Sequence, residues 1–169
     1  MIDFPGLYRA HAPDVHRFAL YLSGDPALAE DIVSETFIRL WNARARVDLA
    51  TVKGYLFAIA RNLFLQERRG ARRATGLDER LADPQPGPLD QLRVRSELEA
   101  VLEALQALPE TDRAAVSMRT DEEVPYEEIG RILGISAGAA KVKVHRARLK
   151  LAEVRRTGGS PIARQESRR

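Results

Sequence analysis

The chain has 169 residues, of which 44% are hydrophobic and 30% are charged, enough for one domain or two small ones with hydrophobic cores. It contains no cysteine, which excludes disulfides, thiol catalysis and cysteine-based zinc sites, and its three histidines, at positions 11, 16 and 145, form no metal-ligand cluster in the sequence. No apolar run approaches the length of a membrane span and the N-terminus lacks the basic start and apolar core of a signal peptide, so we expect a cytoplasmic protein with no membrane insertion and no cofactor.

Charge is unevenly distributed along the chain. The net charge is +3 overall, but it is +6 over residues 41–73 and +8 over residues 141–169, with −8 over residues 74–140 between them. Two basic blocks separated by an acidic one indicate two surfaces that face polyanions. Taken singly, either block is equally compatible with a solvated basic helix end.

Helical periodicity dominates the first 73 residues. Apolar residues recur at three- and four-residue steps from Phe4 to Leu22, and SGDP then ends this helix. Asp25 is a natural N-cap for a second helix, whose apolar side ends at Trp41. Thr51 can cap a third helix, in which we expect the inward side chains to be Val52, Tyr55, Leu56, Ile59 and Leu63.

A second helical block follows a break in the pattern. Residues 74–90 are rich in proline and glycine and predict a flexible linker. The next apolar stripe ends at Pro109, a short helix follows from Glu110 to about Thr120, and residues 157–169 are predicted to be disordered. The stripe comprises Leu98, Val101, Leu102, Leu105 and Leu108. With no β-type alternation, the predicted fold is all-α, with two small helical domains joined by the linker.

The segment YEEIGRILGISAGAAKVKVHRARLKL, residues 126–151, has the spacing of a helix-turn-helix. Gly130 is small where the two helices approach, Gly134 permits the left-handed turn, and Ser136 can cap the second helix. That helix has an apolar stripe at Ala140, Val144, Ala147 and Leu151, with basic side chains elsewhere. Such a helix fits the major groove of DNA. A basic amphipathic helix by itself is also compatible with a membrane surface or a partner protein.

The end of the third helix combines basic, amide and apolar side chains. Arg61, Phe64, Leu65 and Arg68 cluster on one face, with Asn62 and Arg69 beside them. This mixture suits single-stranded or opened DNA, because cations follow the backbone while planar groups stack on exposed bases. Phe64 is compatible with either base stacking or the core, whereas Ile59 and Leu63 are assigned to the core.

Four motifs together resemble the bacterial sigma factors of the extracytoplasmic-function (ECF) type: AEDIVSETFIRLW, YLFAIARNLFLQERR, ALPETDRAAVSMR and the helix-turn-helix. The resemblance implies that residues 1–73 are region 2, which binds the β′ clamp helices of core RNA polymerase and reads and melts the −10 element. It implies that residues 91–156 are region 4, which reads the −35 element and binds the β flap.

The resemblance also assigns candidate residues to each role. The polymerase-binding candidates are Asp31, Glu35 and Arg39. The candidates for the −10 strand are Arg44, Arg46, Lys53, Arg61, Asn62, Arg68 and Arg69. The candidates for the −35 element are Ser136, Lys141, Lys143, His145, Arg146 and Arg148. Ala139 and Val142 replace the threonine and serine that are common in this family at the start of the recognition helix, which affects the −35 preference.

The predicted function is therefore transcription initiation by a non-enzymatic factor that acts as a monomer within the holoenzyme and is regulated by an anti-sigma factor. One alternative is a conventional helix-turn-helix regulator, which binds duplex operators without polymerase, usually as a dimer. The other is a sigma mimic that sequesters an anti-sigma factor. The Arg61–Arg69 cluster disfavours the first alternative, and the two basic blocks disfavour the second.

Overall fold

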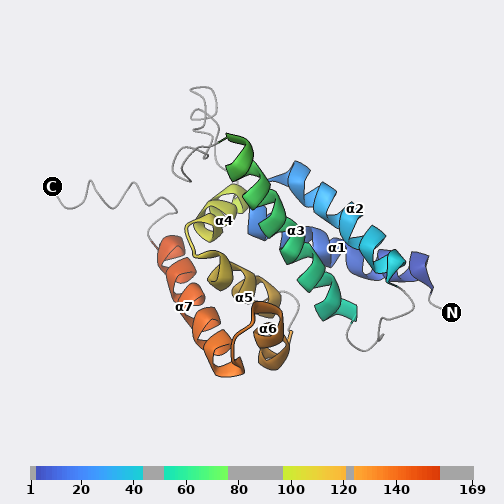
Figure 1. Cartoon of the computed structure of the whole chain (residues 1–169). Helices are drawn as coiled ribbons and strands as arrows, with labels where there is room; N and C mark the ends of the chain where they lie inside the picture. Colours follow the sequence, from blue (N-terminus) through green and yellow to red (C-terminus); the bar gives the residue numbers. More distant parts are fainter. Residues whose placement is uncertain (1–2, 44–51, 76–96, 121–123, 157–169) are drawn as a thin grey trace.

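The computed structural model describes residues 3–43, 52–75, 97–120 and 124–156. Within these residues every regular element is an α-helix, which confirms the all-α prediction (Figure 1). The elements are α1 (Phe4–Ser23), α2 (Pro26–Asn42), α3 (Val52–Thr75), α4 (Glu97–Gln106), α5 (Glu110–Thr120), α6 (Tyr126–Leu133) and α7 (Ala137–Arg156). The predicted capping residue Thr51, most of the predicted linker and the predicted tail lie outside the described residues.

The junction between α1 and α2 has the predicted local chemistry. Gly24 ends α1 in the left-handed conformation, with φ of 65°, and its N–H donates to the Leu20 carbonyl. The Asp25 carboxylate accepts hydrogen bonds from the backbone N–H groups of Ala27 and Leu28, at 3.0 and 3.3 Å. These bonds satisfy donors that the first turn of α2 leaves without helical partners.

The buried face of α3 differs from the predicted one. Leu56, Phe57, Ala60 and Phe64 are buried, whereas Tyr55 is 39% exposed, so its predicted inward position is wrong. Apolar residues lie on several sides of this helix, and periodicity alone does not choose among them. The choice follows from neighbours on two sides, because α3 packs against α1 and α2 and also against α6.

The apolar stripe on α4 is buried over only part of its length. Ala104, Leu105 and Leu108 are buried, but Leu98 and Val101 are 52% and 46% exposed, so only the C-terminal part of the predicted stripe reaches the core. Periodicity indicates which side of a helix is apolar. It carries no information on how far along that side a neighbouring helix extends.

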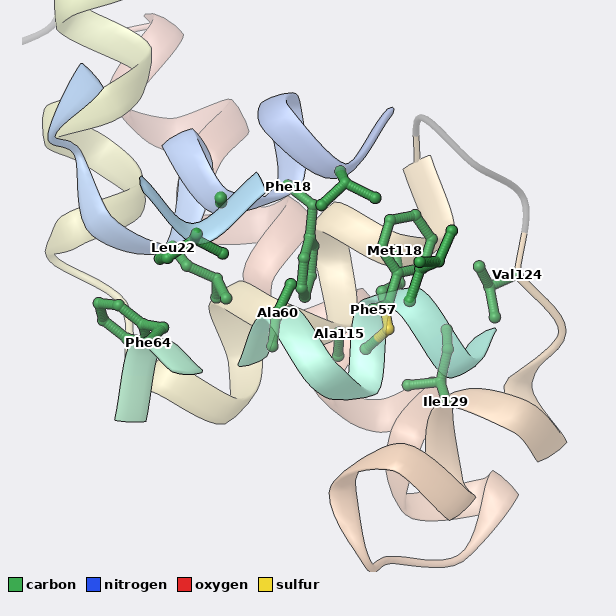
Figure 2. Packing of buried hydrophobic residues seen from close by; sticks show 14 of the residues in the cluster. Phe18, Leu22, Phe57, Ala60, Phe64, Ala115, Met118, Val124 and Ile129 are labelled. Carbon is green, nitrogen blue, oxygen red and sulfur yellow. The ribbon is translucent and has the colours of Figure 1, made fainter. Parts of the chain in front are cut away.

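The first helical group, α1–α3, packs directly against the second helical group, α4–α7. Helix α1 contacts α4 and α5, and α3 contacts α6. Phe18, Leu22 and Phe57 from the first group and Met118 and Ile129 from the second belong to one continuous hydrophobic cluster (Figure 2). The tethered-domain prediction did not include this packing, which brings Arg61 of the first basic block to Glu110 of the second group.

Candidate nucleic-acid interface

The predicted helix-turn-helix is formed by α6, a tight turn and α7. Gly134 adopts the left-handed conformation with φ of 73°, and its N–H donates to the Gly130 carbonyl. The Ile135 N–H donates to the same carbonyl at 2.9 Å. The Ser136 hydroxyl accepts a hydrogen bond from the Ala139 N–H at 3.0 Å, so it caps α7 as predicted. The hydroxyl keeps its own O–H to donate, so the cap is compatible with Ser136 as a candidate for contacting a DNA phosphate.

Gly130 allows α6 and the turn to approach closely. A Cβ atom at this position would lie 2.6 Å from the carbonyl oxygen of Ile135 and 3.2 Å from the carbonyl carbon of Ser136. Both are backbone atoms, so a side chain here displaces the turn that sets the angle between α6 and α7. At Gly138, in the first turn of α7, a Cβ atom would meet nothing within 4 Å.

Gly130→Ala is therefore expected to lower the free energy of unfolding by about 1–3 kcal/mol, because overpacking outweighs the gain in helix propensity. Gly138→Ala is the matched control and is expected to leave this free energy unchanged or to raise it by up to about 1 kcal/mol. Urea unfolding followed by circular dichroism measures both changes. Equal effects at the two glycines would contradict the close approach at Gly130.

Helix α7 presents its basic residues in two rows on either side of a buried stripe. Ala140, Val144 and Ala147 are buried, and Leu151 is half-buried, as predicted. We call Lys141, His145 and Arg148 the open row, because these exposed side chains form no hydrogen bond or ion pair with the residues that the structure describes. We call Lys143 and Arg146 the anchored row, because both contact α5.

The anchored row is held by a carboxylate that sequence reasoning missed. Asp112, in the first turn of α5, is 1% exposed. Its two oxygens lie 3.3 Å from the Lys143 Nζ and 3.4 Å from the Arg146 Nε. Lys143 Nζ also donates to the Thr111 hydroxyl at 3.3 Å. An acid in a first helical turn suits the helix dipole wherever it points, so its sequence position gave no sign of a contact more than 30 residues away.

The basic residues of α3 fall into different environments. Asn62 and Arg69 are exposed, and Arg68 lies over the ring of Phe64, 5.8 Å from its centroid. Phe64 is only 5% exposed, so of its two predicted roles the structure supports the core. Lys53, at the start of the helix, forms an ion pair with Asp14 at 3.9 Å. Arg44 and Arg46 lie outside the described residues.

Arg61 does not face solvent but binds the second helical group. Its Nε and Nη2 donate to the two carboxylate oxygens of Glu110 at 2.8 and 2.9 Å. The side chains of this pair are 13% and 12% exposed. Two parallel charge-assisted hydrogen bonds of this length form a strong, geometrically specific contact. In this arrangement Arg61 is therefore occupied by protein and not available to a DNA strand.

A second buried arginine completes this contact. Arg113 is 4% exposed, donates to the carbonyls of Gln106 and Leu108, and lies over the Phe64 ring at 5.8 Å. The pKa of Arg113 is lowered to about 10, chiefly by burial and also by the nearby positive charge of Arg68, while Glu110 acts in the opposite direction and raises it. The Arg113 guanidinium remains charged at neutral pH, because this pKa lies well above 7.

The polymerase-binding candidates lie along one side of α2. Arg39 Nε is 3.3 Å from Glu35 Oε1, a partly exposed pair one helical turn apart, and Asp31 is exposed one turn earlier. An exposed pair of this kind contributes little to stability and can exchange partners. Two apolar side chains on the same helix are also exposed, Ile38 at 53% and Trp41 at 45%, with Trp41 packed edge-on against Phe4.

Residues 3–43, 52–75, 97–120 and 124–156 contain no group of three or more histidine or acidic side chains placed to hold a metal ion. No helix among them combines the length and the apolar character needed to span a bilayer.

Comparison with known proteins agrees with this geometry. Sigma-70 region 2 matches residues 7–74, and Sigma-70 region 4 matches residues 98–151. The chain is 40% identical over 157 residues to the ECF RNA polymerase sigma factor SigE of Mycolicibacterium smegmatis, covering 89% of this chain and 61% of that protein. It is 33% identical over 145 residues to the ECF RNA polymerase sigma factor SigL of Mycobacterium tuberculosis, covering 83% of this chain and 82% of that one.

A solved structure gives the same result. The sigma factor RpoE, crystallised in complex with the anti-sigma factor NepR from Bartonella quintana, matches with a TM-score of 0.76 at 26% identity, over 91% of this chain and 97% of that one. The two matched regions appear in the same order as the two helical groups described above. The chain belongs to the ECF RNA polymerase sigma factors.

Proposed function

We propose that this sigma factor binds core RNA polymerase, directs it to promoters with its own −10 and −35 preferences, and traps the melted strand without catalytic residues of its own. The observation that carries this proposal is the recognition helix α7, seated by its buried stripe with its open row of basic side chains exposed. Such a helix suits a major groove. The proposed divisions are residues 1–73 for region 2, 74–90 for the linker and 91–156 for region 4.

The proposed −10 surface is the exposed part of α3 with the preceding segment. Asn62 and Arg69 are exposed and able to contact a strand, and Arg44 and Arg46 extend the same basic block. Extruding a base from the duplex costs a few kcal/mol, so phosphate contacts and a base-binding surface are both needed. Arg61 can contribute only after it releases Glu110.

The proposed polymerase-binding surface is the side of α2 that carries Asp31, Glu35 and Arg39. Exposed Ile38 and Trp41 on the same helix add apolar area beside these charges. A mixture of apolar area and exchangeable charges is typical of protein interfaces. The proposed partner surfaces are the β′ clamp helices for α2 and the β flap for region 4.

Regulation and location follow from the same assignment. We propose that the protein acts in the cytoplasm, where core polymerase acts, as one copy per holoenzyme and without a cofactor. An anti-sigma factor is a further proposed partner, supported by the matched RpoE structure, which is a complex with one.

Run-off transcription with purified core polymerase and a promoter library tests the proposed function. We expect specific transcripts only when this protein is added, with shared −10 and −35 sequences among the selected promoters. If no transcripts appear and the protein binds duplex DNA alone, a conventional helix-turn-helix regulator replaces this proposal. If it does neither and binds only an anti-sigma factor, it is a mimic.

Asn62→Ala combined with Arg69→Ala is expected to slow open-complex formation by about 10-fold while leaving closed-complex formation nearly unchanged. Removing one hydrogen bond and one phosphate contact accounts for about 1–2 kcal/mol. Permanganate footprinting of unpaired thymines measures the open complex, and Arg9→Ala, an exposed arginine of α1, is the charge control. A mutant bubble that forms at the wild-type rate would remove both residues from the −10 surface.

A further inference from the structure

The two rows of basic side chains on α7 differ in their partners within the protein itself. The open row, Lys141, His145 and Arg148, has no hydrogen-bonded or ionic partner among the described residues. The anchored row, Lys143 and Arg146, is fixed by Asp112 from α5. The exposed side chains of the open row are free to follow phosphates, whereas the anchored row has a defined position on the protein.

Stability alone does not explain a carboxylate at this position. Asp112 is 1% exposed and faces α7, where an apolar side chain of similar volume is often as stable as a buried ion pair or more so. The cost of burying the charge is offset here by two cations, one at each oxygen. This arrangement fixes the positions of the Lys143 and Arg146 side chains.

The contact with Arg146 leaves the outer edge of its guanidinium available. Asp112 Oδ2 faces the Nε, 3.4 Å away, and the Arg146 side chain is still 53% exposed. The two Nη atoms form a planar fork that matches the O6 and N7 acceptors of guanine, or two phosphate oxygens. Lys143, at 23% exposure and bound to both Thr111 and Asp112, is less available for a new contact.

We propose that Asp112 is a positioning residue that sets the −35 specificity of this sigma factor by holding the Arg146 fork toward one base pair. The inference rests on the proposed function and deepens it by assigning specificity to the α5–α7 contact. The open row then supplies most of the sequence-independent attraction to the backbone. Because the two roles belong to different rows, a change at Asp112 separates specificity from affinity.

Asp112→Asn tests this assignment in the full holoenzyme on a promoter library randomised at the −35 element. We expect the preference at one base pair, or two adjacent pairs, to fall by about 5- to 150-fold, the discrimination of one bidentate base contact. Freed Lys143 and Arg146 charges should keep or increase binding to all sequences, with a salt dependence steeper by about one counterion. A purely structural defect would instead weaken all promoters alike.

Arg146→Lys is the companion variant, since it keeps the charge and the fold but removes the fork. It should lose preference at the same position as Asp112→Asn, and the double variant should lose no more than either single one. If Asp112→Asn fails to fold, Asp112→Glu, which keeps the charge and displaces the carboxylate, serves in its place.

The outcomes separate this inference from the proposed function. A wild-type holoenzyme without any −35 preference would overturn both. A wild type with a preference that survives Asp112→Asn, or that the two variants change at different positions, would overturn the role of Asp112 alone.

Discussion

Glu110→Ala is expected to weaken the packing between the two helical groups by about 3 kcal/mol. This lowers the ratio of closed molecules, in which the two groups are packed together, to open molecules, in which they are separated, roughly 150-fold. The substitution leaves the guanidinium of Arg61 in a site where it is only 13% exposed, without the carboxylate that now takes two of its hydrogen bonds. Truncating one partner of such a pair costs more than the pair contributes, because the remaining charge stays desolvated.

The absence of cysteine makes this opening directly measurable. Spin labels on Ser34→Cys in α2 and Arg131→Cys in α6, both exposed, report the distance between the groups by pulsed electron paramagnetic resonance. We expect a longer and broader distance distribution for Glu110→Ala. Glu127→Ala removes an equal charge from an exposed position in α6 and should leave the distribution unchanged.

Exchanging the two charges of the Arg61–Glu110 pair tests whether the pair itself holds the groups together. Arg61→Glu combined with Glu110→Arg should restore part of the closed population, whereas either single reversal should open the molecule. If Glu110→Ala and Glu127→Ala give the wild-type distribution, the Arg61–Glu110 pair does not hold the groups together.

Reversing the open row with Lys141→Glu and Arg148→Glu is expected to lower −35-dependent initiation by roughly 100-fold. Both side chains are exposed and lack a partner in the described residues, so the reversal should leave the fold intact. Two phosphate attractions become repulsions, which reduces affinity and the steepness of its salt dependence. Binding to core polymerase through the side of α2 that carries Asp31 and Glu35 should be unchanged.

Arg155→Glu with Arg156→Glu is the matched control for this prediction. It makes the same change in net charge on the same helix, in the last turn of α7. Transcription from paired promoters with and without the preferred −35 element, and a pull-down of core polymerase, measure the two functions separately. Equal losses for the two double variants would mean that overall charge, and not the open row, determines −35 binding.

Arg61 links the packing of the two helical groups to DNA binding. The residue is a candidate for the −10 strand, yet it is bound to Glu110 in the described arrangement. A complex in which Arg61 contacts DNA therefore requires this pair to open. Arg61 and Glu110 are 49 residues apart in the sequence, so no local sequence pattern predicts their contact.

The sequence by itself determined those features of this protein that depend on residues close together in the chain. The Asp25 cap, the left-handed Gly134 and the Ser136 cap each depend on residues within four positions of one another. The stripe of Ala140, Val144 and Ala147 follows from the helical period. The motifs of the two sigma regions also lie in the sequence itself, so the family was predictable without coordinates.

Only the tertiary structure decided which side chains are buried or bound to other residues of the protein, and which are available to a partner molecule. The packing of α3 against α1 selects Phe57 over Tyr55 for the core: the Phe57 ring lies 4.8 Å from the Phe18 ring, centroid to centroid, although both positions are aromatic on the same helix. Only the meeting of α3 with α5, and of α5 with α7, shows that Arg61 and Arg146 have carboxylate partners while Arg148 has none among the described residues. Charge in a sequence is a property of each residue, but its compensation depends on contacts between distant segments.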